Sequence, residues 1–431
     1  MSAFRRWAPG ALSLAISVFV LAAVFAGAGE AKTKIVYWTI GTGLQTYRSA
    51  QEGLEEAFEK AHPDIDVDVQ YITDAIETKL QVALASDIAP DVVTLSTRTA
   101  PAFQAQGYLA PIDFAAIGVK DEQSFLKLFV PGMQGILRSI GNDYYWFPAE
   151  ISVFGLFYNE EMLMNAGLDK PGATWQKLAA ESKKFIQKDP SGAWTRWGLT
   201  IPRTWIWPYF TFLTFARQAG GDWVTPDGKP GFSDPKVREA MQYYQDLYLR
   251  LQVLDPTPGR DFGAIFASGK AAYHAGVSYM IADWKRQQAP FTVKSAANPY
   301  LEGGRRSTVA YGYGNFVLAS SKHQKEAWQV AKFFTIDHAS QWFTKAQIFC
   351  PGAGPWLTEV VKQEPNLVPF LQEFQYARLE IVHPKYTDIR SAIVNADKDL
   401  VAGKSVSEVL ATLDDKLRTI LAASATSGQQ K

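Results

Sequence analysis

The chain has 431 residues, of which 47% are hydrophobic and 20% are charged, so it can bury more than a single core and two lobes are expected. Lysine plus arginine and aspartate plus glutamate each number 43, which leaves no basic surplus to neutralise phosphates. This composition excludes a disordered chain and argues against nucleic acid as a partner.

The first thirty-one residues have the pattern of a secretory signal peptide. Arg5 and Arg6 precede an apolar run over residues 11–25, and small residues follow it. We expect cleavage after Ala31 or Ala28, and therefore export to a bacterial periplasm. An uncleaved membrane anchor is the less favoured alternative, because the apolar run falls short of the ~20 residues that span a bilayer.

The single cysteine, Cys350, rules out an internal disulfide. We expect Cys350 to be a small buried residue without a chemical role. No cysteine directly follows the apolar run, so a lipid anchor is not indicated. The stability of the protein therefore has to come from packing.

Strand and helix patterns alternate at the start of the mature chain. Residues 34–38 and 89–96 are apolar runs typical of strands, and residues 64–71 alternate between apolar and polar side chains. Helical spacing predicts helices over 47–61, ended by His62 and Pro63, and over 74–85. This βαβαβ order predicts a parallel sheet with helices on both of its faces.

The rest of the chain continues to mix both kinds of element, with no internal repeat. A capping serine or aspartate and a proline predict the start of a long amphipathic helix within 233–250. The other predicted elements are a strand from 151 to 159, helices over 160–166 and 175–187, a helix–strand–helix run over 266–284, a strand over 311–322, and helices over 325–335, 391–402 and 405–422.

Six stretches, in matching order and spacing, resemble the extracellular solute-binding proteins of ABC transporters. The family meant is the one that includes maltose-binding and glycerol-3-phosphate-binding proteins. The stretches are APDVVTLS at Ala89, YNEEMLMNAGLDKPGATWQKLAAESKKF at Tyr158, FSDPKVREAM at Phe232, FASGKAAYHAGVSY at Phe266, GYGNFVLASSKHQKEAWQVAKFFT at Gly312 and IRSAIVNADKDLVAGKSVSEVL at Ile389. Together they extend over essentially the whole mature chain.

This resemblance implies an α/β fold of the two-lobed periplasmic binding protein type (type II-like). Each lobe would hold a mixed, mainly parallel sheet flanked by helices, and a cleft between the lobes would close on the ligand. The implied first lobe comprises residues 32–149 and 305–340, and the second comprises 150–304 and 341–431. The implied function is capture of a sugar or sugar derivative by a monomer, which delivers it to the membrane permease without cofactor, metal or chemical reaction.

Site residues follow from the family pattern and from the chemistry of sugars. A pyranose ring has an apolar face and a rim of hydroxyls, which suits flat aromatic side chains surrounded by polar groups. The expected ligand-binding residues are Trp38, Thr39, Thr42, Gly43, Ser96, Thr97, Glu150, Trp205, Trp207, Tyr279, Tyr311, Gly312, Tyr313 and Trp356. For Glu150 a salt-bridged carboxylate at the hinge is an equal alternative, and for Trp356 the alternative is a capping contact at a helix start.

The aromatic segment 203–223 poses a choice between core and ligand contact. Trp205 and Trp207 lie between Pro202 and Pro208, which favours a loop in which both indoles stack on the ligand. The alternative is that they pack beneath a helix over 209–218. Within that helix we expect the remaining apolar side chains to be core, namely Phe210, Phe212, Leu213 and Phe215.

Two other functions stay open at the level of the sequence. An anionic polyol derivative, such as a glycerol phosphodiester or a sulfonated sugar glycoside, would use Arg98, Arg203 or Arg390 as counter-charge. A periplasmic carbohydrate-active enzyme would need two converging carboxylates. Only Glu150 is a clear candidate, with Asp222 or Asp283 as weaker partners, and the five scattered histidines form no metal motif.

Overall fold

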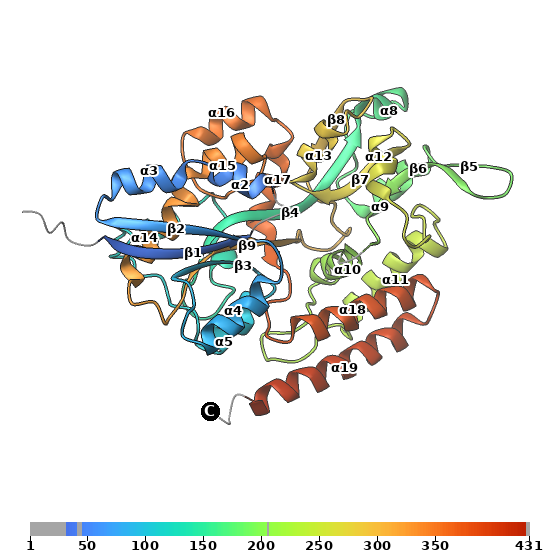
Figure 1. The fold of residues 1–431 in the computed structure, drawn as a ribbon. Coiled ribbons are helices and arrows are strands. Elements are labelled where there is room, and N and C mark those ends of the chain that lie inside the picture. The colour runs from blue at the N-terminus through green and yellow to red at the C-terminus, as the bar shows by residue number, and fades with distance from the viewer. Residues whose placement is uncertain (1–31, 41–44, 205–206, 428–431) are drawn as a thin grey trace, which may run out of the picture.

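A computed structural model describes residues 32–40, 45–204 and 207–427 of the chain. The predicted signal peptide, Thr42, Gly43 and Trp205 lie outside the described residues. Figure 1 shows two bodies of helices and strands, which a few long strands join. We call the part built on strands β1 to β3 the first lobe and the part built on β6 and β7 the second lobe.

The predicted parallel sheet is confirmed in the first lobe. Strand β1 (Thr33–Ile40) pairs in parallel with β2 (Ile65–Ile72) along its whole length and with β3 (Val92–Ser96) on its other side. Helix α4 (Ile76–Ala85) connects β2 to β3, as the helical spacing predicted. The alternation in β2 buries Ile65 and Val67 on one face.

The single helix expected over 47–61 is wrong in one respect, because two helices occupy this region. Helix α2 (Gln45–Gln51) and helix α3 (Leu54–Ala61) are separated at Gly53, which has a φ of 76°. The left-handed conformation at this glycine interrupts a helix that the apolar spacing alone would continue. Ala50, Leu54 and Phe58 are nevertheless buried, as the pattern indicated.

Strands β4 (Phe147–Asn159) and β9 (Thr308–Val317) join the two lobes into one sheet. β9 is antiparallel to β3 and to the first half of β4, whereas the second half of β4 pairs with β7 (Ala271–Val277). The resulting strand order is β2-β1-β3-β9-β4-β7-β6-β5. The mixed α/β class is thus confirmed, although parallel pairing prevails only in the first lobe. The lobe boundaries within the chain stay a prediction.

The remaining elements surround this sheet (Figure 1). The additional strands are β5 (Gln187–Lys188), β6 (Trp194–Thr200), β8 (Val293–Ala296) and β10 (Ala377–Leu379). The helices are α5 (Ala100–Ala105), α6 (Glu122–Leu126), α7 (Gln134–Leu137), α8 (Glu160–Asn165), α9 (Trp175–Ser182), α10 (Trp207–Gln218), α11 (Pro235–Leu249), α12 (Phe262–Ala267), α13 (Met280–Arg286), α14 (Gln324–Phe333), α15 (Ala339–Ala346), α16 (Trp356–Gln363), α17 (Leu367–Glu373), α18 (Tyr386–Val401) and α19 (Val406–Ser427), with 3-10 turns at Ile336–His338 and Phe374–Tyr376. Among the described residues, no helix is long and apolar enough to cross a membrane.

Most later helix predictions are confirmed, and the differences have local causes. The carboxylate of Asp234 accepts a hydrogen bond from the backbone amide of Lys236 and Pro235 begins α11, as expected for this cap. Helix α9 ends at Ser182 rather than at 187. A Cβ atom on Gly198 of β6 would lie 2.1 Å from the Ser182 carbonyl oxygen, so the strand passes directly against the helix end.

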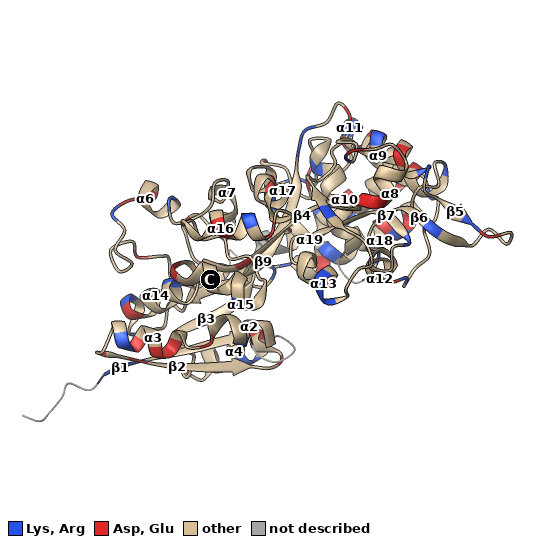
Figure 2. Cartoon of the chain, turned by 90° about the horizontal axis from the view of Figure 1, so that it is seen from above, with Lys and Arg blue, Asp and Glu red and all other residues tan. Residues whose placement is uncertain are grey.

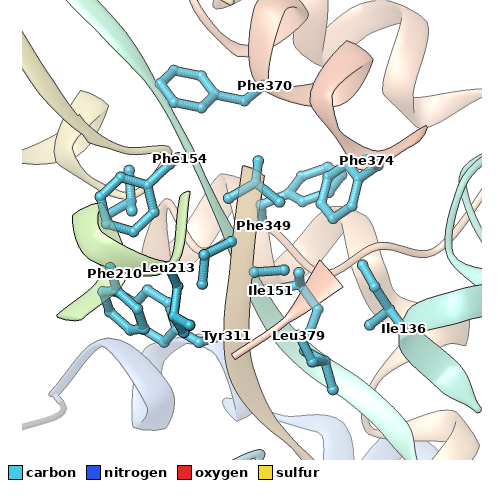
Figure 3. Packing of buried hydrophobic residues seen from close by; sticks show 14 of the residues in the cluster. Ile136, Ile151, Phe154, Phe210, Leu213, Tyr311, Phe349, Phe370, Phe374 and Leu379 are labelled. Carbon is cyan, nitrogen blue, oxygen red and sulfur yellow. The ribbon is translucent and has the colours of Figure 1, made fainter. Parts of the chain in front are cut away.

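An aromatic core fills the junction between the lobes (Figure 3). The ring of Phe210 in α10 stacks on Tyr311 of β9 with centroids 5.1 Å apart, and it also meets Phe154 of β4 at 5.3 Å. Leu213 and Ile151 complete the packing and are fully buried. The prediction that the apolar side chains of this helix are core is therefore confirmed.

One buried carboxylate near this junction makes stability depend on pH. Glu373, at the end of α17, is 1% exposed and pairs with Arg306. Burial raises the pKa of Glu373 to about 7, although Arg306 opposes the shift. The pKa of Glu373 is higher in the folded than in the unfolded chain, so protonation of this carboxyl favours the folded state. Its contribution to the free energy of unfolding is complete below the unfolded pKa of ~4.3 and is lost as the pH rises through 7.

When the pH rises from 5.5 to 7, we expect the free energy of unfolding of the wild-type protein to fall by about 1–2 kcal/mol more than that of Glu373→Gln, which has no carboxyl to titrate at this position. Urea denaturation at a series of pH values measures this difference. Buried His274, whose pKa is lowered to about 3 by desolvation, titrates in both proteins and cancels in the comparison. Parallel pH profiles of the two proteins would contradict the prediction.

Candidate ligand-binding site

Polar and aromatic side chains gather where β4 and β9 run side by side between the lobes. Glu150 of β4 lies opposite Tyr313 of β9 in the sheet, and the register shifts by one residue between Pro148 and Glu150. Such a bulge redirects the side chains of the strand that carries it. Glu150 and Tyr313 are both partly exposed, in a region where most neighbouring side chains are buried.

The carboxylate of Glu150 is hydrogen-bonded to a tyrosine. The hydroxyl of Tyr47 donates a hydrogen bond to Glu150 Oε2 at 2.9 Å, and the Tyr47 ring meets Tyr313 edge to face. No ion pair of Glu150 occurs within the part of the chain that the structure describes, so the salt-bridged alternative is not observed. Burial raises the pKa of the Glu150 carboxyl above its usual value. The remaining carboxylate oxygen can accept a hydrogen bond from a ligand hydroxyl.

A second group of polar side chains surrounds Arg98, in the loop after β3. Arg98 Nε lies 3.2 Å from Glu380 Oε2, and the guanidinium stands 4.9 Å from the centre of the Tyr311 ring. Thr97 donates to the other oxygen of Glu380 at 3.0 Å. Tyr209 of α10 donates to Glu380 and also lies 3.2 Å from the hydroxyl of Tyr386. The charge of Arg98 is therefore neutralised by a buried carboxylate of the same site.

The residues expected from the first and third strands are mostly engaged within the protein. Thr39 is fully buried, and its hydroxyl accepts hydrogen bonds from Tyr37 and Gln51. The partly exposed Trp38 donates through its indole nitrogen to Gln70, and Ser96 is 4% exposed and lies 2.9 Å from the hydroxyl of Thr99. Direct ligand contact by Trp38, Thr39, Ser96 and Thr97 stays a prediction.

Gly312 was expected to let the backbone approach a ligand, and this contact stays a prediction; the structure shows that the adjacent strand lies close to it. A Cβ atom at this position would lie 1.9 Å from the carbonyl oxygen of Glu150. Only glycine allows β4 and β9 to approach this closely beside the bulge. The glycine therefore permits the close approach of the two strands at Glu150.

We expect Gly312→Ala to destabilise the protein by ~1–3 kcal/mol, because the two strands must separate locally. Gly135→Ala is a matched control, since nothing lies within 4 Å of a Cβ atom there. Urea denaturation of both variants makes the test. Equal midpoints for Gly312→Ala and the wild type would contradict the close approach.

Two of the predicted aromatic residues, Trp207 and Tyr311, are packed in the core, and Tyr311 is 6% exposed and stacks on Phe210. Trp207 is 8% exposed and meets Phe154 and Phe210 edge to face. It is the first residue of α10, so the loop expected at this position is wrong for Trp207. Backbone amides in the first turn of a helix have no acceptor within the helix, so a proline, which lacks an amide hydrogen, loses no hydrogen bond there. Pro208 is therefore compatible with the start of α10.

Tyr279 and Trp356 remain available to a ligand. Tyr279 is partly exposed before α13, and burial raises the pKa of its hydroxyl to about 12. It therefore stays protonated and can donate a hydrogen bond at neutral pH. Trp356 is partly exposed and begins α16, which confirms the predicted helix start. Their contact with a ligand stays a prediction.

The sequence reasoning missed several residues that build the site. Tyr47, Tyr209, Glu380 and Tyr386 were not among the candidates. Tyr209 offered one signal, since it alone carries a polar group among the aromatic residues of 209–215 and a buried tyrosine hydroxyl usually has a partner. Glu380 follows a three-residue strand and had no sequence signal.

The chain is similar in sequence to bacterial binding proteins. The family model described as bacterial extracellular solute-binding protein matches residues 41–337. A putative binding protein of Brucella abortus is 23% identical over 408 residues, which cover 93% of this chain and 94% of that protein. An arabinooligosaccharide-binding protein of Halalkalibacterium halodurans is 23% identical over 313 residues, covering 69% of this chain and 66% of its own.

Solved structures share the fold at similarly low sequence identity. The sugar-binding protein MalE of Xanthomonas citri superposes with a TM-score of 0.79 at 21% identity, covering 93% of this chain and all of that one. The cyclic alpha-maltosyl-1,6-maltose binding protein of Arthrobacter globiformis gives 0.76 at 21% identity, covering 90% and 99%. At this level of identity the likeness establishes the architecture of two lobes.

Proposed function

This chain belongs to the bacterial extracellular solute-binding proteins, and from that premise we propose that it captures a neutral mono- or oligosaccharide between its lobes. The bound sugar is delivered to the membrane permease of an ABC importer. The protein acts as a monomer in the periplasm, after removal of its N-terminal signal peptide. Sugar-binding relatives such as the arabinooligosaccharide-binding protein support this ligand class.

The observation that carries the proposal is the partly exposed carboxylate of Glu150 among tyrosines. Tyr47 holds one carboxylate oxygen at 2.9 Å, and Tyr313 lies opposite on the neighbouring strand. A carboxylate accepts hydrogen bonds from two sugar hydroxyls, and tyrosine rings cover the apolar face of a sugar. Glu150 stands on the strand that passes from one lobe to the other, so a ligand bound there can contact both. Closure is driven by the higher affinity of the closed form for the sugar.

Two of the three arginines that an anionic ligand could use are paired with carboxylates of the protein. Arg98 is neutralised by Glu380, and Arg203 Nη2 lies 2.9 Å from Asp397 Oδ2. Arg390 lies on α18, 5.8 Å from the centre of the Tyr386 ring, and is the remaining candidate. Binding a phosphate or sulfonate at Arg98 would require the loss of a buried ion pair, which disfavours the anionic alternative.

Release of an unchanged ligand also fits the carboxylates around the site. Hydrolysis of a glycoside requires two carboxylates that converge on one bond. Asp222 binds Arg217 at 3.0 Å, and Asp283 pairs with Arg286, so neither is positioned as a partner of Glu150 by a contact in the described chain. We therefore propose binding without a reaction.

Titration of the mature protein with neutral oligosaccharides and with glycerol phosphodiesters or sulfonated glycosides tests the proposal. We expect saturable changes in tryptophan fluorescence and a rise in thermal stability with at least one neutral sugar, whose mass stays unchanged after incubation. A response only to anionic ligands would establish the alternative. Appearance of hydrolysis products would establish an enzyme.

A further inference from the structure

A groove in the second lobe lies between α9, α10, α11 and the segment that joins β8 to β9. It has a volume of about 680 Å³ and shares no residue with the site at Glu150. Helices α9, α10 and α11 lie together in both views of the molecule (Figure 1 and Figure 2). Pockets of ~300–1,000 Å³ are of the size that holds small ligands.

The floor of this groove is an aromatic ring fixed in place. Tyr243 of α11 is partly buried, and its hydroxyl donates to the carbonyl oxygen of Trp175 at 3.1 Å. Ala240 and Leu301 continue the apolar surface beside it. The ring therefore offers a preformed apolar floor that does not have to be ordered on binding.

One wall of the groove is built by a buried amide. Gln218 is 1% exposed, and its Oε1 accepts hydrogen bonds from the Trp175 indole and from the Leu301 amide at 3.0 and 3.1 Å. Its Nε2 donates to the carbonyl oxygens of Pro299 and Ser307. These bonds fix the segment after β8 against the end of α10, so the wall is as rigid as the floor.

The rim carries charges of both signs, and one of them, the guanidinium of Arg305, donates a hydrogen bond through Nε to the carbonyl oxygen of Arg217 at 2.7 Å. Lys236 and Glu239 come from α11, and Glu302 and Arg305 come from the opposite wall. All four side chains are exposed, and none forms an ion pair within the residues that the structure describes. Figure 2 likewise shows Lys, Arg, Asp and Glu interspersed over this lobe, without a region of one sign.

From this arrangement we propose that the groove is a second carbohydrate site, which takes a neutral mono- or disaccharide unit independently of the site at Glu150. A hydroxyl group both donates and accepts hydrogen bonds, so a polyol can use the two cations and the two carboxylates together. The Tyr243 ring suits the apolar face of a pyranose. The two carboxylates balance the two cations, so the rim has no net positive charge that would select an anion, and an apolar ligand would use none of the hydrogen-bonding groups of the rim.

The indole resonance of Trp175 reports directly on the groove, because Trp175 contacts both Gln218 and Tyr243. NMR spectra of indole-labelled protein, with this signal assigned from Trp175→Phe, follow titration with glucose, maltose, cellobiose and xylobiose. We expect a saturable shift with at least one of these sugars. The double variant K236A/E239A should raise the dissociation constant at least about tenfold, since it removes two charged hydrogen-bond partners.

Matched variants separate this site from the one at Glu150. R238A/Q242A alters two exposed residues of the same helix outside the groove and should keep the shift. Glu150→Ala should keep it as well, so failure of the proposed function and failure of the groove can be told apart. No shift with any of the sugars, a shift with glycine or inorganic phosphate only, or an unchanged response of K236A/E239A would each overturn the proposal.

Discussion

Glu380→Ala is expected to lower the free energy of unfolding by about 3–5 kcal/mol. Glu380 is 1% exposed and accepts hydrogen bonds from Thr97, Arg98 and Tyr209. Without the carboxylate, the charge of Arg98 stays buried and loses the counter-charge that offset its desolvation. The hydroxyls of Thr97 and Tyr209 lose an acceptor at the same time. Urea denaturation, read as the midpoint and slope, measures the loss.

Two comparisons make this prediction specific. Glu359→Ala removes a carboxylate from the exposed pair with Lys362, where both side chains are about two-thirds exposed, and should change the midpoint much less. In a double-mutant cycle, the loss for R98A/E380A should be clearly smaller than the sum of the single losses, because no lone charge remains. A midpoint for Glu380→Ala as close to wild type as that of Glu359→Ala would show that this ion pair is unimportant.

The second large effect is expected on affinity. Under the proposed function, Glu150→Ala should weaken binding of the neutral sugar by ~2–3 kcal/mol, or roughly 30- to 150-fold, because hydrogen bonds to charged groups are stronger than neutral ones. Glu150→Gln keeps an acceptor oxygen and should lose less. Fluorescence or calorimetric titration of each variant gives the dissociation constants.

Another tyrosine-bound glutamate serves as the control for this result. Glu122 accepts a hydrogen bond from Tyr144 at 2.6 Å in the first lobe and belongs to no part of the site. Glu122→Ala should therefore leave the affinity unchanged. An affinity of Glu150→Ala within twofold of the wild type would remove Glu150 from the binding site, while a fold defect would appear in the urea midpoint.

The elements that could be predicted from the sequence are those with strong local patterns. Strand β2 alternates apolar and polar side chains, and α11 has a cap, a proline and an amphipathic body, so neither needs information from elsewhere in the chain. The break at Gly53 was missed because the apolar spacing continues across it. Trp207 was misjudged because a proline next to it was taken as the end of a loop, whereas a helix accepts proline in its first turn.

The site was predicted less completely than the fold because its contacts are distant in the chain. Thr97 and Glu380 are hydrogen-bonded although 283 positions separate them, and no local pattern indicates such a pair. Glu150 could be proposed because the resemblance placed it at a crossing strand. The close approach of β4 at Gly312 required the structure, because a glycine that admits a ligand and one that admits a neighbouring strand look alike in a sequence.

Because of strand β4, the two lobes cannot be produced separately by a single cut in the gene. The first half of β4 pairs with β9 and its second half with β7, so one uninterrupted segment supplies backbone hydrogen bonds to both halves of the molecule. A gene cut within β4, or between β4 and β9, would separate strands that pair with one another in the sheet. Expression of either half alone would require a rearranged order of segments, and shortening the chain from either end removes parts that the opposite end completes.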